Sequence, residues 1–171
     1  MKPVNFTLPA FGSVIAGQAG ILAAIMRGPS IFGVEQPPYA LLISDKSEGE
    51  TDKHAYGNYG TDVAGATSRT NGKANTDALV LAQSPAALWV RELSIGGHSD
   101  WYVPSLGELN AAAANVPEQF EPKGIYQAST QLSRNLAFVQ DFESGRSNWY
   151  LKDYEFRVRA FRAIPLELLT T

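Results

Sequence analysis

The stretch GHSDWYVPSLGELNAAAANV, residues 97–116, contains a complete start signal for a helix. Ser105 and Glu108 have the spacing of a capping box. In this motif the serine side chain accepts a hydrogen bond from the amide of Glu108, and the glutamate carboxylate accepts one from the amide of Ser105. The alanines at 111–114 let this helix pack closely against a sheet, and Pro117 ends it. These are signals of a scaffold, so we assign the stretch a structural role.

On either side of this stretch, hydrophobic alternation and turn residues predict the other elements. Ser84 and Pro85 predict a second helix, with an N-cap serine and a proline in the first helical position. The other predicted segments are strands at 21–27, 39–44, 101–103, 125–130, 136–142, 147–152 and 154–164, a short helix at 75–83 and a long polar loop at 45–74. The predicted fold class is α+β, with two helices packed on a mainly antiparallel, twisted sheet.

Composition excludes several classes of function. The chain has 171 residues, enough for one domain with a substantial core, and its formal net charge is −3. Binding to nucleic acid requires a basic surface, so we expect no nucleic-acid partner. The absence of cysteine excludes disulfides, cysteine nucleophiles and thiolate metal sites.

The N-terminal segment is unusually apolar. Residues 14–26 form an uninterrupted run with little polarity, but the run covers only about half of a bilayer span. We therefore predict neither a signal peptide nor a membrane span. The predicted organisation is an apolar arm at 1–26, which anchors the subunit or pairs it with copies of itself, followed by one domain at 27–171.

An ordered set of motifs resembles a known family. The motifs are YALLISDKSEGE (39–50), NGKANT (71–76), LSIGGHSDWYVPSLGELN (93–110), IYQAST (125–130), FVQDFESGR (138–146) and FRVRAFR (156–162). In this order they resemble the Lcl C-terminal-type domain, a family with a C-type-lectin-like fold that is frequent in bacteriophage genomes. The resemblance extends from about residue 39 to residue 164.

The resemblance implies a non-enzymatic protein of the phage particle, made in the host cytoplasm and located on the virion surface. It would be a fibre tip, fibre or decoration subunit that binds a host receptor or glycan, with itself and other virion proteins as partners. The alternative is a purely structural capsid, tail or collar subunit without a host ligand. No cofactor is implied.

The resemblance also implies a ligand surface on the C-terminal strands. Carried onto this chain, its candidate residues are Arg146, Asn148, Trp149, Tyr150, Lys152 and Tyr154. Strand alternation requires that Trp149 and Tyr150 point to opposite faces. The polar loop adds Tyr56 and Tyr59, which are aromatic residues among glycines and short polar residues, as in adaptable binding loops.

No catalytic residue or metal ligand is predicted. His54 and His98 lack the partners that a zinc site or a catalytic base requires, and we assign both to ordinary loop hydrogen bonds. The acidic residues at 45–52 follow no calcium-binding pattern and are interpreted as a solvated loop. The arginines of 157–162 have two interpretations, an acidic-ligand site or a solvated strand face, and we favour the solvated face.

Overall fold

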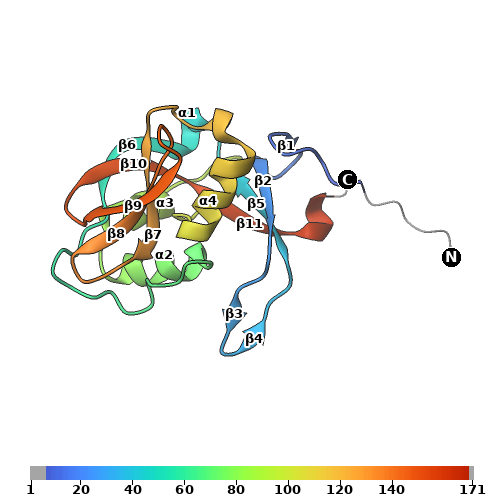
Figure 1. The fold of residues 1–171 in the computed structure, drawn as a ribbon. Coiled ribbons are helices and arrows are strands. Elements are labelled where there is room, and N and C mark those ends of the chain that lie inside the picture. The colour runs from blue at the N-terminus through green and yellow to red at the C-terminus, as the bar shows by residue number, and fades with distance from the viewer. Residues whose placement is uncertain (1–6, 170–171) are drawn as a thin grey trace.

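The computed structural model describes residues 7–169 and contains three sheets and four α-helices within that range (Figure 1). The strands are β1 (Val14–Ile15), β2 (Gly20–Met26), β3 (Ser30–Ile31), β4 (Val34–Glu35), β5 (Tyr39–Ile43), β6 (Glu50–Ala55), β7 (Ile125–Gln131), β8 (Leu136–Asp141), β9 (Arg146–Leu151), β10 (Glu155–Arg159) and β11 (Phe161–Pro165). The helices are α1 (Lys46–Gly49), α2 (Gly72–Leu81), α3 (Pro85–Arg91) and α4 (Leu106–Asn115), with 3-10 turns η1 (Pro117–Gln119) and η2 (Leu166–Leu169).

Two mostly antiparallel sheets share the core. The first has the strand order β1-β2-β5-β11 and is antiparallel throughout, and the second has the order β6-β10-β7-β8-β9. Within the second sheet, the pairing of β10 with β7 is parallel and the others are antiparallel. The third sheet is the short hairpin β3–β4, which extends away from the body (Figure 1). The predicted α+β class with mainly antiparallel sheets is confirmed.

Helix α4 lies where the two large sheets meet. It packs against β2 of the first sheet and against β7 and β8 of the second, and it buries Leu109 and Ala112 there. The predicted capping box is present: Ser105 Oγ accepts from the Glu108 amide, and the Glu108 carboxylate accepts from the Ser105 amide at 2.8 Å. The small side chains at 111–114 permit the close approach that the sequence predicted.

Helix α3 begins as predicted, whereas α2 begins three residues earlier than predicted. Ser84 Oγ accepts from the Ala87 amide, with Pro85 in the first helical position. Asn71 Oδ1 accepts from the Ala74 amide at 3.0 Å and so starts α2 at Gly72 rather than at residue 75. Asparagine is as good an N-cap as serine, so its side chain sets the boundary.

Two expectations for the chain path were wrong. The segment 45–74 is not one loop, because it contains α1 and strand β6, which pairs with β10. The predicted strand at 154–164 is two strands in different sheets, since the Ala160 amide donates to Gly49 O and its carbonyl accepts from the Ser44 amide. The predicted strand at 101–103 contributes a single bridge, from Tyr102 to Phe161.

The predicted arm at 1–26 is not separate from the domain. Strand β2 lies between β1 and β5, and four of its side chains are at most 7% exposed, so the domain extends at least from β1. The apolar composition of this segment reflects a central strand that is buried on both faces. Residues 1–6 of the predicted arm lie outside the described residues.

The arginines near the C-terminus do not form a solvated face. Arg159 and Arg162 are 1% and 7% exposed, and they pair with Glu50 and Asp100. Both acidic partners are far away in the sequence, which is why local alternation could not identify them. Arg157 also pairs with Glu50, at 3.2 Å.

Four tyrosines make stability sensitive to alkaline pH. Burial is the main cause that raises the pKa of Tyr39, Tyr56, Tyr102 and Tyr126 above the usual value of 10. Above that value the unfolded chain loses protons that the folded chain retains. The free energy of unfolding is therefore expected to fall as pH rises beyond 10, by up to about 1.4 kcal/mol per pH unit for each tyrosine.

Urea unfolding at intervals from pH 8 to pH 11 measures this slope. Tyr56→Phe removes one titrating hydroxyl and is expected to reduce the slope above pH 10 by up to about 1.4 kcal/mol per pH unit. An identical slope in the variant would contradict the assignment.

Candidate functional site

The predicted ligand surface lies on an edge strand. Strand β9 pairs with β8 on one side and ends the order of the second sheet on the other. Its residues are exposed except for the half-buried Tyr150. Trp149 lies opposite Phe138 and meets its ring edge to face at 6.3 Å, while half of the indole remains exposed. The Trp149 amide donates to Asn148 Oδ1 at 2.9 Å.

A second aromatic group forms around the turn that follows β9. The rings of Tyr150, Tyr154 and Phe156 lie within 5.1–6.5 Å of one another, and Tyr154 is half exposed. Because side chains alternate along a strand, Trp149 lies on one face of β9 and Tyr150 on the other. The candidate residues therefore form two adjacent aromatic surfaces rather than one. Arg146 is exposed at the start of the strand.

Lys152 does not belong to this surface. Its side chain is buried, and its ammonium group donates to Thr61 O at 2.9 Å and to Gln131 Oε1 at 2.8 Å. Loss of water around the ammonium lowers the pKa of Lys152, and the nearby Asp62 carboxylate partly opposes this effect. The lysine connects the turn after β9 to the long loop through these hydrogen bonds. Because its side chain is buried, the prediction that it contacts a ligand was wrong.

The loop 56–71 is pinned by side chains from elsewhere. Tyr56 is buried and its hydroxyl donates to Ser129 O at 2.9 Å, which contradicts its prediction as a binding residue. Gln131 closes the loop further on through two bonds to the backbone of Val63. Tyr59 remains half exposed, as a loop contact would require.

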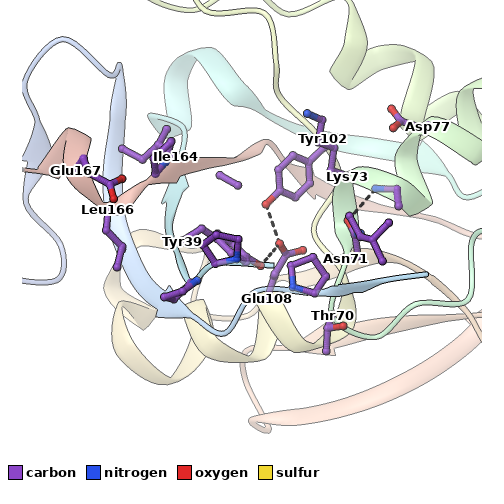
Figure 2. A pocket seen from close by; sticks show the side chains of 17 residues that line it. Tyr39, Thr70, Asn71, Lys73, Asp77, Tyr102, Glu108, Ile164, Leu166 and Glu167 are labelled. Atoms are coloured by element: carbon purple, nitrogen blue, oxygen red, sulfur yellow. Dashed lines mark hydrogen bonds between the residues drawn. The ribbon is translucent and has the colours of Figure 1, made fainter. Parts of the chain in front are cut away.

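A cavity that the sequence did not predict lies at the base of the β3–β4 hairpin, next to the end of this loop and the start of α2 (Figure 2). Its volume is about 660 Å³. Apolar walls come from the hairpin, from the prolines before β5 and from the end of β11 with η2, and one polar side comes from the first turn of α2. Residues that represent these walls are Ile31, Pro38, Ile164, Leu166 and Lys73.

Glu108 lies at the floor of the cavity between two tyrosines (Figure 2). Its Oε1 accepts from the hydroxyls of Tyr39 at 2.6 Å and Tyr102 at 2.7 Å. Its Oε2 accepts from the Ser105 amide and hydroxyl, both at 2.8 Å, and from the Gly72 amide at 3.1 Å. Burial and the adjacent carboxylate raise the pKa of both tyrosines, so they remain neutral donors at neutral pH.

This carboxylate is occupied as a structural acceptor. Five donors share its two oxygens, which leaves no lone pair aimed at a substrate, as a general base would need. The capping box identified Glu108 from the sequence, but Tyr39 is 69 residues away and only the fold brings it to the site. The chemistry that the cavity offers is burial of an apolar group above a satisfied polar floor.

The other titratable candidates have structural partners. His98 Nε2 lies 2.9 Å from Gly17 O, and the His54 ring packs against Trp89. Of the acidic loop residues, Asp45 caps α1, and Glu50 is buried against arginines rather than solvated. Within residues 7–169 we found no cluster of three or more His, Asp or Glu side chains suited to a metal ion.

Comparisons with known proteins bear on the fold. No family model matches this sequence, and no curated protein matches it. Among solved structures, a fimbrial protein from Bacteroides ovatus is similar over 92% of this chain, with a TM-score of 0.59 and 14% sequence identity. The chain spans 45% of the length of that protein. None of the described helices is long and apolar enough to cross a membrane.

Proposed function

We propose that this protein is a non-enzymatic surface subunit of a bacteriophage particle that binds a host receptor or glycan through the exposed side chains of edge strand β9 and of the turn after it. The proposal includes a C-type-lectin-like fold, which the ordered motifs support and with which the two mostly antiparallel sheets and few helices are compatible.

The observation that carries the proposal is the exposure of aromatic rings on an edge strand. Trp149 is 51% exposed on one face of β9 and Tyr154 is 50% exposed in the turn after it, and Arg146 and Asn148 are exposed on the same strand. Aromatic faces bury large apolar areas at small entropic cost and stack on sugars or on protein side chains, while amide and guanidinium groups supply directional hydrogen bonds. Lys152 and Tyr56 are excluded from this surface by their burial.

A non-enzymatic role is supported by how the polar residues are used. Glu108, which is at the floor of the cavity below the β3–β4 hairpin, is saturated by five donors. The two histidines have ordinary structural contacts, and the carboxylate of Asp141 accepts from the turn residues Glu143 and Ser144. These arrangements favour a protein that acts by surface complementarity.

The second candidate function is a purely structural virion subunit. Exposed apolar side chains away from β9 favour it, among them Val14 at 73% and Phe32 at 103% exposure. A neighbouring subunit would cover such residues in an assembled particle.

Anchoring of the subunit through its N-terminal segment is compatible with both candidate functions. Because β2 is a central strand, a test of anchoring must spare it and remove only residues before β1.

Trp149→Ala and Tyr154→Ala are each expected to weaken binding to host cells about tenfold or more, because each removes an aromatic contact worth over 1 kcal/mol at an interface. Fluorescently labelled protein is titrated onto intact bacterial cells, with unlabelled protein as competitor. Leu81→Ala serves as the matched control, since Leu81 is an exposed apolar residue at the end of α2.

Saturable binding that the control retains and the two variants lose would support the receptor-binding function. Absence of saturable binding at micromolar concentration by the folded protein would contradict it and favour the structural candidate. Equal binding by all three variants would contradict the assignment of the site to β9.

A further inference from the structure

The β3–β4 hairpin exposes an apolar tip. Its strands pair through Ser30 with Glu35 and through Ile31 with Val34, and the hairpin extends beyond the body of the molecule (Figure 1). Ile31, Phe32 and Val34 are 43%, 103% and 62% exposed. Two-stranded hairpins are at best marginally stable alone in water, so a hairpin this short gains from being covered.

Phe32 is an unfavourable residue for its position. Its φ is +49° and that of Gly33 is +78°, a pair of left-handed residues that tight hairpin turns fill with Asn-Gly or Asp-Gly. A bulky aromatic side chain in this region is strained, and full exposure to water adds a second cost. Contacts within the chain compensate for neither cost, because the ring is fully exposed.

A cavity that can accommodate such a ring lies at the base of the same hairpin. The cavity of about 660 Å³ has walls of proline, isoleucine and leucine, and its polar floor is already satisfied by the Tyr39–Glu108–Tyr102 bonds (Figure 2). An apolar ring that enters it leaves no buried polar group without a partner, whereas a polar ligand would find few free groups on the floor.

We infer that a second copy of this chain supplies that ring: Phe32 of one subunit inserts into the cavity of another, and the exchange is reciprocal about a two-fold axis. The tip lies at one end of the hairpin and the cavity at its other end. When the hairpins of two subunits lie side by side in opposite directions, the tip of each therefore reaches the cavity of the other. Such a self-complementary contact closes as a dimer and does not propagate into a filament. The cavity is then completed by a residue of the partner copy.

The buried area fits this occupant. The exposed parts of Ile31, Phe32 and Val34, together with the smaller area of cavity wall that they cover and counted in both directions, amount to about 1,000 Å², the lower limit for a specific protein interface. Glu35 follows the tip on the hairpin but is already paired with Arg27 of its own chain, so it adds no free charge to the contact.

This inference goes beyond the proposed function and does not depend on host binding. Sedimentation velocity of the full chain from 1 to 100 µM is expected to show a monomer–dimer equilibrium. Phe32→Asn suits the left-handed turn and keeps the hairpin, but removes the anchor from both exchanges. It is expected to raise the dimer dissociation constant at least 100-fold, the effect of losing an interface hot spot. Leu81→Asn is the matched control and should leave the constant unchanged.

A mixing experiment separates this contact from any other mode of association. Pro38→Arg places a charge at the mouth of the cavity but retains Phe32, so it too should be monomeric. An equimolar mixture of Pro38→Arg and Phe32→Asn retains one intact exchange and is expected to form heterodimers more readily than either variant forms homodimers. A wild-type chain that stays monomeric at 100 µM, a dimer that Phe32→Asn leaves unchanged, or a mixture without heterodimer would each overturn the inference.

Discussion

Glu108→Ala is expected to lower the free energy of unfolding by about 4 kcal/mol, because it removes the acceptor for five hydrogen bonds at once. The hydroxyls of Tyr39 and Tyr102 and the amide of Gly72 lose a buried partner, and α4 loses half of its capping box. Bonds to a charged acceptor are stronger than neutral ones, and each donor left unsatisfied in the interior carries a desolvation cost. Urea unfolding at pH 7, followed by far-UV circular dichroism, measures the loss.

Two further variants make this result specific. Glu108→Gln keeps the shape of the side chain but turns an NH₂ group toward donors, and we expect a loss of about 2 kcal/mol. Glu118→Ala removes an exposed glutamate from η1 and should change stability by less than about 0.5 kcal/mol. If Glu108→Ala lowers the free energy of unfolding by less than about 1 kcal/mol, water or other groups replace the carboxylate. That result would contradict its role as the shared acceptor on the cavity floor.

The helix starts could be predicted because their signals are local. Ser84 and Ser105 each act within three residues of their own position, and a capping box is a short pattern with a defined geometry. Strands β7, β8 and β9 were similarly predicted to within about a residue by alternation between turn residues. Local signals of this kind do not depend on which distant segment the element contacts.

The errors arise where a distant contact decides the outcome. Strand β6 is mostly polar and glycine precedes it, so it resembles a loop until its partner β10 is known. The division between β10 and β11 results from the hydrogen bonds of Ala160 to Ser44 and Gly49, more than 100 positions earlier in the chain. Alternation alone predicted one continuous strand across that point.

The same reason explains the outcome for the candidate sites. Lys152 and Tyr56 have residue types common at surfaces, but both are buried: Lys152 donates to Thr61 O of the long loop, and Tyr56 packs in a cluster with Val63 and Leu79. The cavity floor joins Tyr39 from β5 to Glu108 from α4, and no sequence spacing relates the two. Trp149 and Tyr154, which were candidate ligand residues, are exposed because an edge strand and a turn leave such side chains in solvent.

Arg159→Met is expected to cost 3–5 kcal/mol, about the usual penalty for breaking a buried ion pair on one side. Arg159 is the last residue of β10, and its guanidinium group links this strand to other parts of the chain. It donates to Glu50 Oε2 at 2.9 Å, to Gln119 O at 2.8 Å and to Ser44 O at 2.7 Å. Methionine fills a similar volume but cannot donate hydrogen bonds. Glu50 therefore loses one of its partners, and the carbonyls of Ser44 and Gln119 each lose the donor that Arg159 supplies. Chemical unfolding at pH 7 measures the difference.

Removing the acid as well tests whether the uncompensated charge causes the loss. The double variant Glu50→Gln/Arg159→Met is expected to be less destabilised than the sum of its single variants, by 1 kcal/mol or more on a double-mutant cycle. Arg146→Met is the matched control, since that arginine is exposed on β9 and its loss should cost less than about 0.5 kcal/mol. Additive losses in the cycle would mean that Arg159 stabilises the fold through contacts other than Glu50, namely its bonds to Ser44 and Gln119 and its packing on Phe120, whose ring centre lies 5.3 Å from the guanidinium carbon.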